Sequence, residues 1–303
     1  MLKRPLLSII VVFFNMRREA PRTLYSLTRA YQRHADTLDY EVIAVDNGSS
    51  EPLDEETVTG FGKHFRYLYV QTASVSPSSA VNVAAAGARG RYVTVCVDGA
   101  RILSPGVLHY TALATHLDAA PVITTLGWHL GEKLQNEALL DGYDQYAEDG
   151  LLADANWQAD GYRLFDISCL AGSSVNGWFL PFPESNCLTV SRSMFEALGG
   201  FDEGFSTPGG GLVNLDFLKR ACELSQSTLI VLLGEGTFHQ FHGGVATNVP
   251  LGEHPWKEFA QEYERLRGEA YTIPRQAPLF LGAMPRAALP FLHHSAEKAL
   301  ERR

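Results

Sequence analysis

The stretch 39-DYEVIAVDNGSS-50 joins a short apolar run to a polar turn. Val42 to Val45 form a continuous apolar run, which is typical of a strand covered on both faces in a parallel sheet. Asp46 follows directly and would stand at the carboxyl end of that strand, where open α/β sheets bind their ligands. The same letters would also suit an ordinary polar turn, so the rest of the sequence has to separate the two interpretations.

Strand and helix patterns alternate on both sides of this stretch. In the first 120 residues the sequence predicts strands over 6–14, 41–46, 66–71 and 91–98, and helices over about 19–34, 78–88 and 105–117. Further along it predicts apolar strands over 121–128, 186–191 and 228–233, and helices over 192–198 and about 212–224, 255–268 and 288–301. This order is typical of an α/β fold with ligand-binding loops at the strand ends.

The length of 303 residues allows one large domain or two small ones. We expect one α/β domain over 1–250 and a helical extension over 251–303 that packs on it. The pattern weakens over 131–177, which suggests an acceptor-side or lid insertion, although a plain surface excursion fits nearly as well. The apolar, proline-containing segment 277–294 suggests core packing, with an oligomer contact or a membrane-surface contact as alternatives.

Composition and charge argue against several classes of protein. The formal net charge is −9 and the pI is about 5.6, so we expect no nucleic-acid partner. The four cysteines are scattered without metal-ligand spacing, which favours a reducing cytoplasm. The apolar run over 6–14 is too short to span a bilayer, so we expect no transmembrane segment and at most a peripheral membrane contact.

No glycine-rich phosphate loop follows the first predicted strand. The chain there reads 13-FFNMRRE-19, without the glycines of a dinucleotide fingerprint or a P-loop. A bound nucleotide would therefore have to be held by side chains.

Four segments, in this order, resemble the inverting glycosyltransferases of family 2, which have the GT-A fold. They are 8-SIIVVFFN-15, 42-VIAVDNGSS-50, 79-SAVNVAAAGARGRYVTVCVDGAR-101 and 184-ESNCLTVSRSMFEALGGFDEGF-205. The resemblance covers about residues 5–245 and implies a GT-A (Rossmann-like) mixed, mostly parallel sheet with helices on both faces, followed here by a helical C-terminal tail. It also implies transfer of a sugar from a nucleotide diphosphate sugar, with a UDP-sugar favoured, to a hydroxyl acceptor with inversion, as in polysaccharide biosynthesis.

The same resemblance implies a nucleotide-sugar site at the ends of the first strands. Asp46 would contact the nucleoside, because its two carboxylate oxygens can accept several hydrogen bonds. Asn82 would supply a further polar contact, unless it is a solvent-facing residue of its helix. The other expected residues of this site are Phe14, Asn15, Asn47, Gly48, Ser49, Asp98 and Gly99.

Asp98 resembles the first acid of the family's DxD motif, which holds a divalent cation that neutralises the charge of the leaving diphosphate. The second acid is replaced by Ala100, so Mn²⁺ or Mg²⁺ would bind through one carboxylate together with phosphates and water. Arg101 could compensate by reaching phosphate oxygens. His242 resembles the C-terminal histidine that several GT-A enzymes bring to the metal, whereas for His239 a structural role is favoured.

The family's usual position for the catalytic base carries an amide in this chain. Within 209-GGGLVNLDFLKRA-221 this position falls on Asn214, and an amide is not a general base. Asp216 acting in a shifted geometry and Glu184 acting from the other side of the acceptor pocket are the two candidates for the base. Trp178 and Asn214 are the expected acceptor contacts.

Two other functions compete with sugar transfer. A non-catalytic module that binds a sugar nucleotide or a glycan is favoured by Ala100 and Asn214, which replace two acids of the family pattern. A nucleotidyltransferase of similar layout ranks last, because the glycine-rich loop after the first strand is missing.

Overall fold

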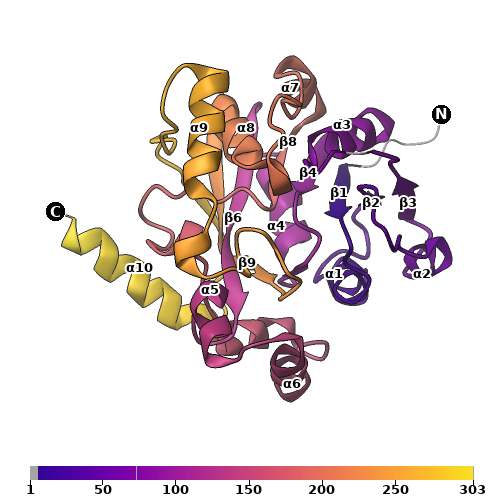
Figure 1. Cartoon of the computed structure of the whole chain (residues 1–303), viewed down its shortest axis with the longest axis vertical. Coiled ribbons are helices and arrows are strands. Elements are labelled where there is room, and N and C mark those ends of the chain that lie inside the picture. The colour runs from indigo at the N-terminus through magenta and orange to yellow at the C-terminus, as the bar shows by residue number, and fades with distance from the viewer. Residues whose placement is uncertain (1–5, 73, 303) are drawn as a thin grey trace.

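A sheet that runs through the protein explains the apolar runs of the sequence. The structure is a computed structural model that describes residues 6–72 and 74–302. Within these residues the strands form one ten-stranded sheet in the order β10-β9-β6-β8-β4-β1-β2-β3, with β5 pairing with β9 and β7 with β6 (Figure 1). The strands are β1 (Leu7–Phe13), β2 (Tyr40–Asp46), β3 (Phe65–Tyr69), β4 (Tyr92–Cys96), β5 (Arg101–Leu103), β6 (Pro121–Leu130), β7 (Ser168–Leu170), β8 (Leu188–Ser191), β9 (Thr228–His239) and β10 (Leu279–Gly282). The α-helices are α1 (Ala20–Tyr25), α2 (Glu55–Gly60), α3 (Ser78–Gly87), α4 (Val107–Ala114), α5 (Gln135–Ala138), α6 (Gln145–Ala155), α7 (Arg192–Ala197), α8 (Val213–Cys222), α9 (Trp256–Arg267) and α10 (Leu289–Glu301).

The first four strands form the parallel part of the sheet. β1 pairs with β2 and β4, and β2 pairs with β3, all in parallel. Every residue of β1 and β2 is buried, and alternate residues of β1 enter two apolar clusters, with Ile10 and Val12 in one and Ile9 and Val11 in the other. Because both faces of the strand are covered, its sequence is continuously apolar.

The second half of the sheet returns the chain to the edge where the parallel strands end. β8 is antiparallel to β4, β9 is parallel to β6, and the short β5 is antiparallel to β9. In the β5–β9 pair Arg101 lies directly opposite His239. This pairing brings the segment that follows Asp98 to the end of the last long strand.

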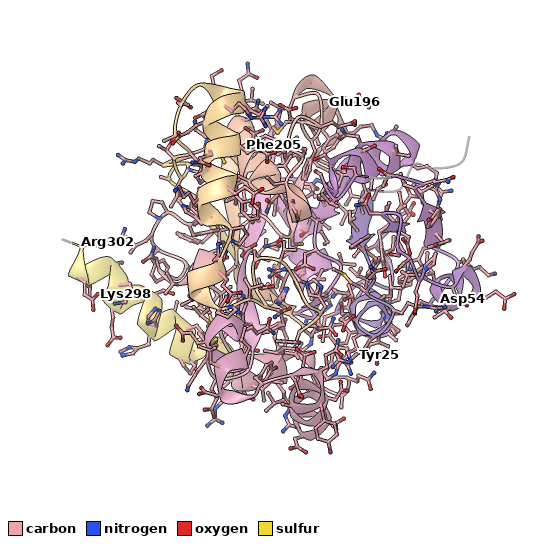
Figure 2. The ribbon with its side chains drawn as sticks, viewed as in Figure 1. Tyr25, Asp54, Glu196, Phe205, Lys298 and Arg302 are labelled. Carbon is pink, nitrogen blue, oxygen red and sulfur yellow. The ribbon has the colours of Figure 1, made fainter. Side chains whose placement is uncertain are left out.

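The fold class expected from the sequence is confirmed. The sheet is mixed and mostly parallel, helices cover both faces, and a C-terminal helix follows (Figure 1). Figure 2 shows Lys298 and Arg302 toward the outer end of α10, which runs away from the sheet. In the described part of the chain, none of the helices combines the length and the apolar character needed to cross a membrane.

The helix expected over 19–34 ends early, at Tyr25. The hydroxyl groups of the next residues compete with the helical hydrogen bonds. Ser26 Oγ donates to the carbonyl of Thr23, and Thr28 Oγ1 donates to the carbonyl of Tyr25.

The two later segments also differ from the expectation. Residues 131–177 are not irregular, because they form α5, α6, β7 and short 3₁₀ turns. In the extension 251–303, Leu279–Gly282 pairs in parallel with Ile230–Leu233 of β9. The extension therefore adds an edge strand to the sheet and is not helical throughout, because the outer edge of β9 offers backbone partners to residues 279–282.

Candidate active site

Asp98 stands two residues beyond the end of β4, at the edge where the parallel strands end. Its side chain is 20% exposed, and its Oδ1 accepts a hydrogen bond from the Ala100 N–H at 3.0 Å. His239 Nε2 lies 3.0 Å from Oδ2, and His242 Nε2 lies 3.7 Å from Oδ1. The ligand atoms of these three side chains all lie within 4.8 Å of one another, so one carboxylate and two imidazoles could share a cation.

Burial and charge set the protonation states in this cluster. Burial lowers the pKa of His239 to about 4, so its ring is neutral near pH 7. Burial alone would raise the pKa of Asp98, but His239, His242 and Arg101 together hold it well below its usual value. At neutral pH the cluster therefore pairs an ionised carboxylate with a neutral imidazole, which are the forms that bind metal ions.

Arg101 supports Asp98 from inside the sheet. It is 4% exposed, its Nε donates to Asp98 Oδ2 at 3.3 Å, and its Nη1 donates to Thr237 Oγ1 at 3.3 Å. The expected approach of its guanidinium to phosphate oxygens is not found, because the β5–β9 pairing buries the side chain. In this structure its positive charge acts on Asp98.

The candidate acceptor-side residues lie on the other side of Arg101. Glu184 is 1% exposed. A Cβ added to Gly127 would lie 2.5 Å from Glu184 Oε2 and 3.1 Å from Arg101 Nη1, so the two side chains face the same glycine. Asn214, half-buried on α8, donates from Nδ2 to Ser185 Oγ at 3.0 Å. The structure thus brings Glu184 and Arg101 together.

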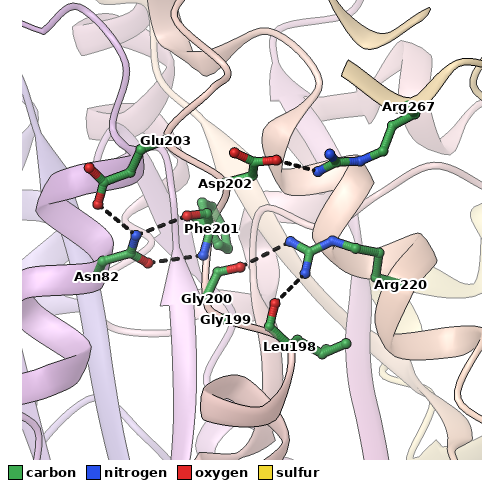
Figure 3. Close-up of a pocket in the computed structure, with 9 residues that line it drawn as sticks. All are labelled: Asn82, Leu198, Gly199, Gly200, Phe201, Asp202, Glu203, Arg220 and Arg267. Carbon is green, nitrogen blue, oxygen red and sulfur yellow. Dashed lines mark hydrogen bonds and ion pairs between the residues drawn. The ribbon is translucent and has the colours of Figure 1, made fainter.

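Asp216 has no oxygen free to act as a base. It is fully buried, and its oxygens accept hydrogen bonds from Arg220 Nε at 2.7 Å and from Arg267 Nε and Nη2 at 2.6 and 2.8 Å. Both arginines line an open cavity of about 580 Å³, where Arg267 also pairs with Asp202 at 2.8 Å (Figure 3). Two guanidinium groups occupy its carboxylate, which argues against the expected role of Asp216 as the catalytic base.

Asn82 lines the same cavity and has a structural role. Its Nδ2 donates to the Phe201 carbonyl and to Glu203, each at 2.9 Å, and its Oδ1 accepts from the Phe201 N–H at 2.9 Å (Figure 3). These bonds tie α3 to residues 198–203. The amide is fully used in this way, so neither the nucleotide contact nor the solvent-facing role expected for Asn82 is found.

The turn that follows β2 is built around Asp46. This side chain is fully buried, its Oδ1 accepts from the Ser49 N–H at 2.9 Å, and its Oδ2 accepts from the Leu53 N–H at 2.9 Å. Gly48 has a φ of 75°, a left-handed conformation that favours glycine. The carboxylate of Asp46 is directed into the turn, so the expected direct contact with a nucleoside is not available in this structure.

The residues next to this turn keep groups that a ligand could use. Ser49 Oγ accepts from the Asn15 N–H at 2.8 Å, which joins the ends of β1 and β2, and Phe14 is 46% exposed. Asn47 is 4% exposed, and its Nδ2 donates to the Ser76 carbonyl at 3.3 Å. Its Oδ1 has no hydrogen-bond partner among the described residues. A buried acceptor of this kind suits the N–H group of a ligand.

Trp178 and Gly99 are packing residues. Trp178 is fully buried, its ring centroid lies 5.8 Å from that of Trp128, and its Nε1 donates to the Leu232 carbonyl at 3.3 Å. Neither face of this ring is exposed for stacking on a sugar, which argues against the expected acceptor contact. Gly99 is buried against β1, where a Cβ would lie 2.4 Å from the ring of Phe13.

Two residues of the site were misjudged or missed in the sequence. His239 was expected to be structural, yet its Nε2 lies closer to Asp98 than that of His242 does. The HxxH spacing of His239 and His242 could have indicated their shared site. When a loop follows the end of a strand, both imidazole rings can point toward the same position. Gln135 was missed because its partner His239, 2.6 Å away, is 104 positions distant in the chain.

Comparisons with known proteins agree with this fold. Residues 8–104 match the model of the family described as glycosyl transferase family 2. No curated protein sequence matches the chain. Among solved structures, the chain resembles S. aureus TarS 1-349 with a TM-score of 0.52 and 16% identity, over 78% of this chain and 60% of that one.

Two further structures share the fold. TarS 1-349 in complex with UDP-GlcNAc has a TM-score of 0.53 and 16% identity, over 86% of this chain and 66% of that one. The mannosyltransferase PcManGT from Pyrobaculum calidifontis, in complex with GDP-Man and Mn²⁺, has a TM-score of 0.51 and 17% identity, over 99% of this chain and 71% of that one. The chain spans 60% of the TarS 1-349 fragment and 37% of TarS. The chain therefore carries a match to glycosyl transferase family 2 over residues 8–104, and its fold is that of the GT-A glycosyltransferases.

Proposed function

We propose that the protein transfers a sugar from a nucleotide diphosphate sugar to a hydroxyl group of an acceptor, with inversion at the anomeric carbon. The observation that carries the proposal is the cluster of Asp98, His239 and His242, whose acid stands at a strand end within the family-matched region. The bound UDP-GlcNAc of TarS and the GDP-Man of PcManGT support a nucleotide-sugar donor. Inversion follows from the resemblance of the sequence segments to inverting enzymes.

The cluster fits a divalent cation. Its donor set of one carboxylate and two imidazoles favours Mn²⁺ over Mg²⁺, which prefers oxygen ligands. When bound, such an ion would neutralise the negative charge that develops on the leaving diphosphate. Asp98 is kept ionised for this role by the adjacent Arg101 and histidines.

The nucleotide would lie at the ends of β1 and β2. The unpartnered Oδ1 of Asn47 can accept a hydrogen bond from the ring N–H of uracil or guanine. Phe14 offers an exposed ring close to the Asn15–Ser49 contact. Gly48, with a φ of 75°, allows the left-handed backbone of this turn.

The base that we propose is Glu184. Its Oε2 accepts from Ser173 Oγ at 2.5 Å and lies with Arg101 beside Gly127, and its Oε1 accepts from the N–H and the Nδ2 of Asn186 at 2.8 and 2.7 Å. Unlike Asp216, Glu184 accepts hydrogen bonds from neutral donors and from no guanidinium group in the described part of the chain. Its carboxylate would take the proton of the acceptor hydroxyl while the hydroxyl oxygen attacks the anomeric carbon and the bond from that carbon to the diphosphate breaks. Asn214, on the neighbouring α8, would contact the acceptor.

Binding of a sugar nucleotide without transfer is the second candidate function. Two observations favour it, namely the amide of Asn214 at the usual base position and the occupied carboxylate of Asp216. An Asn214→Asp variant separates the two functions. If the wild type is only a binding module, the added carboxylate should produce turnover that the wild type lacks.

Calorimetric titration with UDP-, GDP- and dTDP-sugars, with and without Mn²⁺, tests the main proposal. We expect one of these donors to bind more tightly with Mn²⁺ and to be hydrolysed slowly without an acceptor. Asp98→Ala should lose the effect of Mn²⁺, whereas the exposed control Glu132→Ala should keep it. Tight binding without sugar release would favour the binding module, and no binding of any donor would contradict both functions.

The cellular setting belongs to the same proposal. All four cysteines are free, in line with the cytoplasmic location expected from their spacing. A role in polysaccharide biosynthesis stays a prediction.

A further inference from the structure

The chain that leaves β9, residues 239–249, carries both histidines of the cluster, and we call it the histidine loop. The segment around α5 and α6 holds this loop by side-chain bonds to its backbone. Gln135 Nε2 donates to the carbonyl of His239 at 3.0 Å. Asn136 Nδ2 donates to the carbonyls of Ala246 and Val249 at 2.9 and 2.7 Å. The loop is therefore attached to the segment that the sequence analysis assigned to the acceptor side.

Gln135 also determines which nitrogen of His239 carries the proton. Its amide orientation is fixed, because Nε2 must be the atom that donates to the carbonyl of His239. Its Oε1 then lies 2.6 Å from His239 Nδ1, and an oxygen acceptor at this distance requires a proton on Nδ1. A proton on Nδ1 leaves the lone pair of a neutral ring on Nε2, 3.0 Å from Asp98 Oδ2, where both atoms could bind one cation.

The same amide oxygen is linked to His242. Asn248 Nδ2 donates to Gln135 Oε1 at 3.1 Å. Asn248 Oδ1 accepts from the backbone N–H groups of His242 and Gly243 at 3.1 and 2.9 Å. Through Asn248, Gln135 reaches the backbone of the second histidine as well.

Glu148 on α6 holds the loop between the two histidines. Its side chain is completely buried, and its Oε2 accepts from the Phe241 N–H at 2.6 Å. Arg18 and Arg22 lie within 3.4 and 3.7 Å of its Oε1, so the carboxylate is fixed from the opposite side. α6 thereby connects the histidine loop to the segment after β1.

We propose that Gln135 and Glu148 are positioning residues of the cation site, so that α5 and α6 serve the donor side of the active site. Residues that hydrogen-bond to a metal-binding histidine orient its ring and fix its tautomer, which strengthens metal binding. Their loss lowers metal affinity by about 10–100-fold. The inference rests on the proposed cation site, and it adds that residues more than ninety positions away in the chain organise that site.

The inference is tested by titrating the full chain with Mn²⁺ alone. Binding is measured as the loss of the electron paramagnetic resonance signal of the free ion. Gln135→Leu removes all three side-chain hydrogen bonds of Gln135 at similar volume and should raise the Kd for Mn²⁺ about 10–100-fold. Glu148→Leu should weaken binding in the same direction. Glu137→Leu, an exposed change on the same helix α5, should bind as the wild type does.

A second measurement covers the case in which Gln135→Leu does not fold. Long-range ¹H–¹⁵N spectra of the histidine-labelled, metal-free wild type should show His239, assigned by its loss in His239→Asn, with the proton on Nδ1. A proton on Nε2 would overturn the inference, and so would wild-type Mn²⁺ affinity in a folded Gln135→Leu. Each of these results would leave the proposed cation site intact, whereas a wild type that binds no Mn²⁺ would overturn both.

Discussion

Asp98 and Asp216 are two acids of the same family pattern, and their surroundings are opposite. Asp98 faces the ring nitrogens of His239 and His242 and keeps a fifth of its side chain exposed. Asp216 is fully buried, and its oxygens receive three N–H groups from Arg220 and Arg267. The first carboxylate is available to a ligand, whereas the second is consumed by the fold.

This difference shows what makes an acid functional in such a chain. A guanidinium fork satisfies a carboxylate completely, because it supplies both the charge and the hydrogen-bond donors. A neutral imidazole supplies a lone pair instead, and Arg101 reaches Asp98 through its Nε alone at 3.3 Å, so the carboxylate of Asp98 is not enclosed by guanidinium groups. The sequence motif alone does not show whether an acid is available to a ligand or is used by the fold. The side chains that contact each acid do show it.

The largest expected effect comes from Asp98. Asp98→Ala removes the one carboxylate of the cluster, so we expect kcat for sugar transfer or donor hydrolysis to fall roughly 100–1,000-fold, or about 3–4 kcal/mol. The thermal unfolding midpoint should change little, because Asp98 is partly exposed. If Asp98→Ala keeps the wild-type kcat, the carboxylate of Asp98 has no role in the reaction, and its contrast with Asp216 has no functional meaning.

Asp216→Asn should act on stability instead of activity. It leaves two guanidinium groups without their shared anion, and breaking such a pair costs about 3 kcal/mol. Urea unfolding measures the loss, and the kcat of the remaining folded protein should stay close to that of the wild type. A stable but inactive variant would restore Asp216 as a candidate base.

Glu235 is another buried acid, and among the described residues it has no cationic partner at bonding distance. It accepts hydrogen bonds from Ser104 Oγ at 2.5 Å, the Gly106 N–H at 3.0 Å and Tyr162 Oη at 2.6 Å. Burial raises its pKa to about 7, against 4.5 for an ordinary glutamate. The folded state therefore binds the proton more tightly than the unfolded state does, so ionisation of Glu235 destabilises the fold as pH rises from 4.5 to 7.

Glu235→Gln removes this titration. We expect the free energy of unfolding of the variant to gain about 2 kcal/mol on that of the wild type between pH 5 and pH 8. Urea unfolding at the two pH values measures this gain. A difference that is constant between these two pH values would contradict the titration of Glu235 in this range.

Asn82→Ala should have the smallest effect. It removes the paired bonds to Phe201, so we expect a loss of about 1–2 kcal/mol in the free energy of unfolding. The affinity for the nucleotide should not change, because Asn82 lies in the cavity of Figure 3 beside Arg220 and Arg267. A selective loss of nucleotide affinity would contradict its structural role.

The sequence by itself determined the parallel strands, the turn at Asp46 and the position of Asp98. These are local patterns, because an apolar run and the turn residues that end it are neighbours in the chain. The sequence could not assign roles to Asp46 or Trp178, because these residue types with these neighbours are compatible with a binding site and also with the core.

Only the tertiary structure decided which acids are free. Gln135 and His239 are 104 positions apart, and Asp216 and Arg267 are 51 apart, so no local pattern reports these contacts. The antiparallel pairing of β5 with β9 places Arg101 opposite His239 and brings the histidine loop to Asp98. The chemistry of a carboxylate depends on the groups within hydrogen-bonding distance, and in this fold those groups come from distant parts of the chain.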